Sequence, residues 1–356
     1  MERHLITGAT GFLGSWLALD LLATTDAHVT CLVREQPGTD PTDRVRQTLH
    51  RAAAHHETVD PTEIDLRIDA VPGDVTSPDL IDLSDTLGRV DEVWHSAASL
   101  KYRDSDLDEI QSTNVVGTRN IVELAGRTGA TAFNHISTAY VAGRSTGVIR
   151  ETTVAPDHPT FNQYEKSKVT GESIVLGADL RTRIFRPSIV IGHSETFVAD
   201  SSMGLFGFLR DMSRFVRGSS RSGKIPEIRL LAHPDSTLNF IPVDLVTSSA
   251  VEISQSDSDA QVFHLTNGTP AHMGDALLTA ARMLGLPDPI FTEDRDSLSP
   301  LDRRLNRFLD FYIPYLGGER VFDRTATDSI VGSRCDYPLP LPVLERLVQT
   351  WIDTHA

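Results

Sequence analysis

A glycine-rich segment near the start of the chain constrains the fold more than any other feature. Residues 7–14 read TGATGFLG, with glycines at positions 8, 11 and 14. A short apolar run (HLIT, residues 4–7) precedes it, and a helical pattern of apolar side chains follows. A glycine turn between a strand and a helix lets the backbone approach a pyrophosphate at the positive helix N-terminus. The segment therefore predicts a dinucleotide site, with the spacing GxxGxxG in place of GxGxxG.

The first half of the chain alternates apolar runs with helical patterns, which predicts repeated βαβ units around a parallel sheet. Strands are expected at residues 4–7, 28–33, 92–94, 132–137 and 183–191, with another that ends near Pro72, and helices at 41–56, 106–128 and 162–177. The predicted fold class is α/β, a Rossmann-type doubly wound parallel sheet with a smaller, mostly helical C-terminal domain.

The composition changes beyond Gly192. Residues 193–236 are rich in Ser, Gly and Arg, residues 238–268 return to the α/β pattern, and residues 270–356 are mostly helical in pattern. We therefore predict two domains. The dinucleotide-binding domain is expected to comprise residues 1–192 and 237–269, and the substrate-binding domain residues 193–236 and 270–356.

Charge and cysteine content exclude several functions. The chain has 33 Lys and Arg against 49 Asp and Glu, a net charge of −16, which disfavours binding to nucleic acid or an anionic membrane. Two cysteines, Cys31 and Cys335, are too few for a disulfide scaffold, and no HxxH, CxxC or acidic cluster predicts a metal. No apolar run reaches the roughly 18 residues of a membrane span, and structured residues begin at His4, which leaves no signal peptide. We expect a soluble cytoplasmic protein.

Arg34 bears on the choice of cofactor. It closes the second predicted strand, 34 − 14 = 20 residues after Gly14. An acid at this position binds the ribose 2′-hydroxyl, whereas an arginine can pair with a 2′-phosphate. Arg34 therefore favours NADP(H), although Glu35 adjoins it. Arg44, in the polar helix that follows, is either a second phosphate contact or a surface residue.

Tyr164 and Lys168 form a candidate proton-transfer pair. They stand four residues apart in YEKSKVTGESIV, so one helix face carries both. An ammonium near a phenol is expected to lower the phenol's pKa, and the pair can exchange a proton with a substrate oxygen during hydride transfer. Ser137 and Thr138 end the fifth strand, at the edge where such sheets bind ligands. One of these hydroxyls could donate to the same oxygen, or bond only to the backbone.

Six elements in order along residues 3–268 carry a family resemblance: TGATGFLG, HSAAS (95–99), Asn114, ISTAYVAG (136–143), YEKSK (164–168) and RPSIVIG (186–192). Together they resemble an extended short-chain dehydrogenase/reductase. CLVR, GDVTSPDL, VWHSAASLKYRDSD, FNHISTAYVAG and IFRPSIVIGHS resemble most closely its thioester-reductase and fatty acyl-CoA reductase branch, the male sterility type. FLDFYIPYLGGERVFD resembles the C-terminal region of that branch more loosely.

The resemblance implies roles for individual residues. Thr138 matches the catalytic Ser/Thr of the family, Tyr164 its acid and Lys168 its ribose-binding partner. The implied cofactor-binding residues, besides Tyr164 and Lys168, are Gly8, Thr10, Gly11, Phe12, Leu13, Gly14, Arg34, Arg44, Asp74, Val75, Ser96, Ala97, Ala98, Asn114, Pro187 and Ile189. His95 is expected on the wall near the nicotinamide-side ribose, and Asn114 is expected to steady the helix behind the site.

The resemblance also implies a reaction. NADPH would reduce an acyl thioester of coenzyme A or a carrier protein to an aldehyde, with further reduction to an alcohol left open. Tyr164 and Thr138 would stabilise the oxyanion, and no acyl-enzyme is needed, since neither Cys31 nor Cys335 has the context of a nucleophile. The chain has no room for upstream adenylation or carrier domains, so a free-standing enzyme is expected.

Two segments of the C-terminal half bear on the substrate. Residues 203–224 hold one acid, Asp211, and five basic residues, Arg210, Arg214, Arg217, Arg221 and Lys224, four of them at helical spacing. They could receive a coenzyme A or phosphopantetheine phosphate or dock an acidic acyl carrier protein, or simply pair with acids elsewhere. The stripe Leu298, Leu301, Leu305, Phe308, Leu309 and Tyr312 is either core or in part the wall of an apolar pocket. His193 and His233 are expected to be surface or hydrogen-bonded histidines.

Two other functions remain open from the sequence. An NADP-dependent dehydrogenase, ketoreductase or epimerase could act on a free sterol, flavonoid or nucleotide sugar, without a pantetheine arm. A non-catalytic dinucleotide sensor would bind NADPH without turning over any carbonyl compound. The presence of both Tyr164 and Lys168 argues against the sensor.

Overall fold

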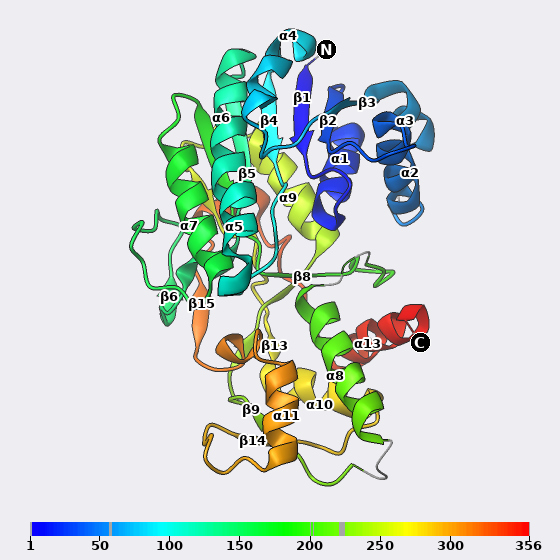
Figure 1. The fold of residues 1–356 in the computed structure, drawn as a ribbon, viewed down its shortest axis with the longest axis vertical. Coiled ribbons are helices and arrows are strands. Elements are labelled where there is room, and N and C mark those ends of the chain that lie inside the picture. Colours follow the sequence, from blue (N-terminus) through cyan, green and yellow to red (C-terminus); the bar gives the residue numbers. More distant parts are fainter. Residues whose placement is uncertain (1, 57–58, 200, 202, 221–224, 356) are drawn as a thin grey trace.

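The computed structural model describes residues 2–56, 59–199, 201, 203–220 and 225–355 (Figure 1). Its largest sheet has seven parallel strands in the order β12-β7-β5-β4-β1-β2-β3. These strands are β1 (Arg3–Thr7), β2 (His28–Val33), β3 (Ile68–Pro72), β4 (Glu92–His95), β5 (Ala132–Ile136), β7 (Arg181–Phe185) and β12 (Val262–Phe263). The order reverses between β1 and β4, which is the switch point where such sheets bind ligands. The predicted Rossmann-type fold class is confirmed.

Helices cover both faces of this sheet. One face packs against α1 (Phe12–Thr24), α2 (Pro41–Ala53), α3 (Pro61–Arg67) and α9 (Val243–Gln255), and the other against α6 (Gly117–Arg127) and α7 (Gln163–Leu176). Successive strand residues alternate between these two cores: Ile6 joins the first and Leu5 the second. Burial on both faces explains why the strands read as continuous apolar runs.

The helix predicted over residues 106–128 is interrupted in its geometry. It consists of α5 (Leu107–Ile110), a π-helical turn at Gln111–Val116 and α6. Short helical segments at Pro78–Leu83, α4 (Ser84–Leu87) and Asp104–Asp106 complete this side of the fold. The helix predicted over 41–56 ends earlier, at Ala53.

One predicted strand is wrong. Residues 183–191 form two strands, β7 and β8 (Ile189–Ile191), and β8 pairs with β11 (Phe240–Pro242) in a separate sheet. Pro187 lies at the break, because proline has no N–H to donate to a ladder. The break also leaves the Arg186 guanidinium buried, where it binds the Glu172 carboxylate on α7 at 2.6 Å and 2.9 Å.

The C-terminal half builds a second core, drawn below the sheet in Figure 1. Its elements are α8 (Gly204–Ser220), β9 (Arg229–Leu231), β10 (Thr237–Leu238), β13 (Ala271–His272), α10 (Met273–Met283), β14 (Ile290–Thr292), α11 (Pro300–Phe308), a 3₁₀ turn at Ile313–Tyr315 and α13 (Leu341–His355). Most of the predicted apolar stripe is buried here, whereas Phe308 is 37% exposed. This core includes Ile191 of β8 and Phe240 of β11, and β8 follows β7 of the large sheet in the chain.

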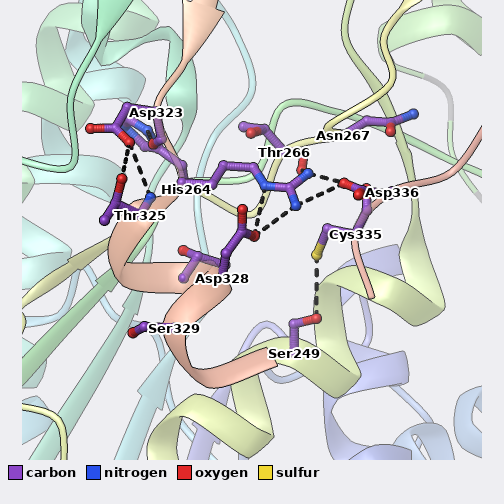
Figure 2. Close-up of polar contacts among 12 residues, drawn as sticks. Ser249, His264, Thr266, Asn267, Asp323, Thr325, Asp328, Ser329, Cys335 and Asp336 are labelled. Atoms are coloured by element: carbon purple, nitrogen blue, oxygen red, sulfur yellow. Dashed lines mark hydrogen bonds and ion pairs between the residues drawn. The ribbon is translucent and has the colours of Figure 1, made fainter. Parts of the chain in front are cut away.

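The end of the chain also returns to the large sheet. The strand β15 (Arg320–Phe322) pairs with β6 (Gly147–Ile149), and α12 (Thr325–Val331) packs on α9. The Arg324 guanidinium forms ion pairs with the carboxylates of Asp328 and Asp336, both labelled in Figure 2, at 2.7 Å and 2.9 Å. Residues 270–356 therefore contribute to both cores, and the two-domain boundaries stay a prediction.

Candidate active site

The glycine turn has a geometry that only glycine can adopt. Gly8 has φ +79°, and a Cβ there would lie 2.7 Å from the backbone nitrogen of Ala97, while a Cβ on Gly14 would overlap the carbonyl of Gly8. Gly11 is the N-cap of α1, and no side-chain hydrogen bond caps this helix in the described part of the chain. The first N–H groups of α1 are thus directed toward an anion site at the turn. These features fit the pyrophosphate of a dinucleotide.

A cavity of about 1290 Å³ runs from this turn along the carboxyl edge of the sheet. Every predicted cofactor residue lines it except Asn114, that is, Gly8, Thr10, Gly11, Phe12, Leu13, Gly14, Arg34, Arg44, Asp74, Val75, Ser96, Ala97, Ala98, Tyr164, Lys168, Pro187 and Ile189. Single-ligand pockets usually measure roughly 300–1,000 Å³. The cavity therefore has room for a dinucleotide and a second molecule.

Three arginines line one end of the cavity. Arg34 follows β2, and Arg44 and Arg51 come from α2. Arg51, whose Nη2 donates to the Thr48 hydroxyl at 3.4 Å, was not singled out from the sequence. The seven-residue spacing from Arg44, two helical turns, is the signal that could have found it.

Lys168 and Tyr164 lie on α7 and line the cavity beside the end of β5. The buried Lys168 ammonium donates to the carbonyl of Ile136 at 2.7 Å, and burial lowers its pKa to about 8. Burial, reinforced by the neighbouring Glu165 carboxylate, raises the pKa of Tyr164. The sequence predicted a lowered pKa for this phenol, whereas the structure raises it, because the phenol is desolvated and lies near the Glu165 carboxylate. The phenol is therefore protonated at neutral pH, the form that can donate a proton.

The structure separates the two hydroxyls at the end of β5. Ser137 Oγ donates to the buried Glu172 carboxylate at 2.5 Å. Thr138 Oγ1 instead accepts the backbone N–H of Tyr140 at 3.2 Å. This bond does not use the hydroxyl proton of Thr138. Ser137 thus belongs to the Glu172–Arg186 pair, and Thr138 is the better donor to a ligand in the cavity.

Two predicted residues lie behind the site. Asn114 is buried, accepts the N–H of Ser99 at 2.7 Å and donates to Ser167 Oγ on α7 at 2.9 Å. His95 does not line the cavity as expected: its ring bonds to Thr7 and Thr118, and burial, aided by Lys168, lowers its pKa to about 3. Both residues hold the loop after β4 rather than a ligand.

His193, His233 and the two cysteines are placed as expected. His233 is exposed, and the buried His193 stacks on Trp16 with ring centroids 5.2 Å apart. Both cysteines are buried, and burial raises the pKa of Cys31 to about 12. Within the described ranges, no three His, Cys, Asp or Glu side chains are placed to hold a metal ion, and no helix there is long and apolar enough to cross a bilayer.

The far end of the cavity is apolar and comes mainly from the C-terminal core. Its lining residues there are Leu205, Phe208, Leu238, Phe240, Ala276, Leu277, Ala280 and Leu316, none of them charged. Of the predicted apolar stripe, Tyr312 reaches this wall, and Phe311 lines it as well. Sequence patterns identified the stripe but did not show which members face the cavity.

Tyr315 and Glu165 join this wall to α7, and neither was singled out from the sequence. The Tyr315 hydroxyl donates to the fully buried Glu165 carboxylate at 2.5 Å and accepts from the Asn162 amide at 2.8 Å. Glu165 also accepts the N–H of Phe161 at 2.7 Å. Burial raises the pKa of Glu165, so this hydrogen bond stabilises a costly buried acid one residue after Tyr164.

Comparison with known proteins agrees with this geometry. The model of an NAD-binding family described as Male sterility protein matches residues 6–250. The chain therefore belongs to this family, within the extended short-chain dehydrogenases/reductases, and the resemblance seen in the sequence is confirmed. The name of this family supports a nicotinamide dinucleotide as the cofactor.

Curated relatives are longer proteins. Glycine betaine reductase ATRR of Emericella nidulans is 29% identical over 313 residues, 82% of this chain and 23% of the relative. The putative fatty acyl-CoA reductase CG8303 of Drosophila melanogaster is 26% identical over 314 residues, 74% of this chain and 54% of the relative. The isonitrile lipopeptide synthase of Streptomyces coeruleorubidus is 28% identical over 290 residues, 77% of this chain but 18% of the relative. The chain thus spans about half of these relatives or less.

Solved structures share the fold over almost the whole chain. The terminal R domain from the myxalamid PKS-NRPS biosynthetic pathway has a TM-score of 0.73 at 24% identity and covers 99% of this chain and 91% of its own. A thiolation-reductase di-domain from an archaeal non-ribosomal peptide synthetase has a TM-score of 0.76 at 19% identity, covering 99% of this chain and 75% of its own. At these identities the likeness shows the fold.

Removal of the Tyr315 hydroxyl tests the link between the C-terminal wall and α7. We expect Tyr315→Phe to lower the free energy of unfolding by about 1–3 kcal/mol, because a buried carboxylate loses its donor. Chemical denaturation measures this change. The control is Tyr140→Phe, since the Tyr140 ring packs on Tyr315 with centroids 4.9 Å apart but its hydroxyl is not the one bound to Glu165. Equal losses in the two variants would contradict the link.

The lowered pKa of Lys168 predicts a pH dependence. The ammonium is present below pH 8 and is lost as the pH rises through about 8, so kcat/KM should fall over that range. Lys168→Arg keeps a positive charge and should move the fall to higher pH, whereas Lys166→Arg, at an exposed position of the same helix, should leave the profile unchanged. A wild-type profile that stays flat far above pH 8 would remove the ammonium from the mechanism.

Proposed function

We propose that this chain is an NADPH-dependent reductase that converts an acyl thioester of coenzyme A or of a carrier protein to the aldehyde. The observation that carries the proposal is one cavity lined by the glycine turn, by the Tyr164–Lys168 pair and by an uncharged pouch. The pouch is the apolar far end of the cavity, lined by Leu205, Phe208, Leu238, Phe240, Ala276, Leu277, Ala280 and Leu316. The names of the relatives, a fatty acyl-CoA reductase and a thiolation-reductase di-domain among them, support the thioester substrate.

In this proposal, the cofactor lies along the cavity from the arginine end to the Tyr164–Lys168 pair, and the apolar far end is left for the substrate. The glycine turn and the N-terminus of α1 bind the pyrophosphate, and Asp74 and Val75 lie beside the adenine. Arg34, Arg44 and Arg51 bind the 2′-phosphate, which is the basis for NADPH over NADH. Lys168 binds the nicotinamide-side ribose, with Pro187 and Ile189 beside the carboxamide. When bound, NADPH supplies the hydride that adds to the thioester carbon.

In the proposed reaction, side chains of this protein stabilise the negative charge on the carbonyl oxygen and transfer a proton to it. Thr138 and Tyr164 donate hydrogen bonds to the carbonyl oxygen, which becomes negative as the carbon is reduced. Tyr164 then gives its proton to this oxygen, and a hemithioacetal forms. In the next step the Tyr164 phenolate takes that proton back while the C–S bond breaks. The aldehyde is released, and the departing thiolate takes a proton from solvent. A second cycle on the aldehyde would give the alcohol.

Removal of the Tyr164 hydroxyl tests the acid. We expect Tyr164→Phe to bind NADPH normally but to lose at least ~10²-fold in kcat for an acyl thioester, the scale of general-acid catalysis. Fluorescence titration measures cofactor binding, and loss of NADPH absorbance measures turnover. The control Ser137→Ala should lower stability with a smaller effect on kcat, since its hydroxyl faces Glu172. Turnover close to wild type in Tyr164→Phe would remove this phenol from the reaction.

The arginine cluster predicts cofactor preference. Arg34→Asp should lower the ratio of kcat/KM for NADPH over NADH by roughly 10- to 100-fold, because a charge-assisted phosphate contact is lost and a repulsion is gained. Arg89→Asp, exposed at the opposite edge of the sheet, is the control with the same charge change. An unchanged ratio in Arg34→Asp would show that Arg34 does not read the phosphate.

A further inference from the structure

The basic residues of α8 lie next to a second basic helix. Of the segment singled out from the sequence, Arg214 and Arg217 are exposed on α8, and Arg221 and Lys224 lie outside the described residues. The helix α11 adds three exposed arginines, Arg303, Arg304 and Arg307. The sequence alone does not connect the two groups, because about 90 positions separate them and only the packing of helices brings such segments together.

Contacts between the two helices make these arginines one surface. The rings of Phe215 on α8 and Phe308 on α11 lie with centroids 6.2 Å apart, and Phe308 is 37% exposed. A Cβ on Gly218 would lie 2.9 Å from Nη2 of Arg304, so this guanidinium reaches the last turn of α8. Figure 1 shows α8 and α11 side by side at the end of the molecule away from the large sheet.

The charge of this surface is opposite to that of the rest of the chain. Together α8 and α11 hold six arginines against Asp211 and Asp302, a sum of 6 − 2 = +4, so the remaining residues sum to −16 − 4 = −20. Asp302 does not neutralise the surface, because it is 1% exposed and its carboxylate accepts the N–H groups of Arg229 and Ser299. Asp211 bonds to Arg210 and Arg214 at 3.2 Å and 3.3 Å. The exposed face therefore attracts acidic groups that the rest of the protein repels.

The same two elements also form a wall of the cavity. Leu205 and Phe208 of α8 line the cavity, and so do Phe311 and Tyr312, which lie three and four residues after the end of α11. On α8, Arg214 and Arg217 follow Phe208 by six and nine residues, so a molecule bound to them would lie roughly 9 to 14 Å along the helix from the cavity wall. This position suits a substrate that arrives on a flexible arm.

We propose that the arginine surface of α8 and α11 docks an acidic carrier protein that presents the acyl thioester on its phosphopantetheine arm. The inference rests on the proposed function, since it names the source of the thioester. Several exposed arginines around a partly exposed phenylalanine fit an acidic helix with an apolar side chain better than they fit the few phosphates of coenzyme A.

A charge-reversal triple variant tests the surface. Arg214→Glu/Arg217→Glu/Arg307→Glu is compared with Arg89→Glu/Arg119→Glu/Arg127→Glu, which changes the net charge equally at exposed sites of the sheet domain. The probes are octanoyl thioesters of a stand-alone acidic acyl carrier protein, of coenzyme A and of pantetheine. We expect the first variant alone to raise KM for the carrier-protein substrate by about tenfold or more. The affinity of this variant for the carrier protein should fall by a similar factor. High salt should weaken the binding of the carrier protein to the wild-type protein.

The other outcomes separate the hypotheses. Both variants should retain wild-type thermal stability and KM for octanoyl-pantetheine. A rise in KM for octanoyl-CoA alone would assign the arginines to the phosphates of coenzyme A and overturn the docking surface. Equal effects of the two triple variants, or no effect of either, would also overturn the docking surface. If wild-type protein reduces none of the three thioesters, the proposed function fails. Carrier-protein binding that the first variant loses and the second keeps would then still support the surface, and unaltered binding would overturn it.

Discussion

The contact between the two ends of the glycine turn underlies the rest of the structure. Gly8 and Gly14 approach so closely that a side chain on Gly14 would overlap the carbonyl of Gly8, and Gly8 itself packs on the backbone after β4. This contact fixes the start of α1 above β1, at the point where the strand order reverses. The adenosine end of the cavity, the anion site and the distance to α7 all follow from that placement.

Burial then sets the chemistry on α7. Lys168 is desolvated and directed at a backbone carbonyl, while Tyr164 is desolvated beside an acid, so the pKa of the ammonium falls and that of the phenol rises. The Glu172 carboxylate is hydrogen-bonded to Ser137 and Arg186. The Glu165 carboxylate is hydrogen-bonded to Tyr315. Tyr164 and Lys168 thus share α7 with two buried carboxylates, one bound to the strand side and one to the C-terminal wall. The hydrogen bond between Tyr315 and Glu165 therefore ties the C-terminal wall of the cavity to α7.

Sequence patterns predicted the sheet and many of the residues that line the cavity, because both depend on local signals. The glycine turn, the strand ends and the Tyr164–Lys168 spacing are encoded within a few residues. The break at Pro187 was missed because an apolar run looks the same in one strand or two. Arg51 and Tyr315 were missed for a different reason: nothing local distinguishes them, and only the packing of α2 and of the chain end brings them to the cavity. His95 was placed on the wall because its position, not its burial, is visible in the sequence.

The central claim is that the uncharged pouch receives an acyl thioester next to the nicotinamide. The most direct measurement incubates the protein with NADPH and a panel of acyl-coenzyme A, acyl-pantetheine and free ketones or alcohols, with thiol and carbonyl products identified by mass spectrometry. The account predicts that a thioester oxidises NADPH and releases one thiol and one aldehyde together. Reduction of a free ketone with every thioester left intact would contradict it.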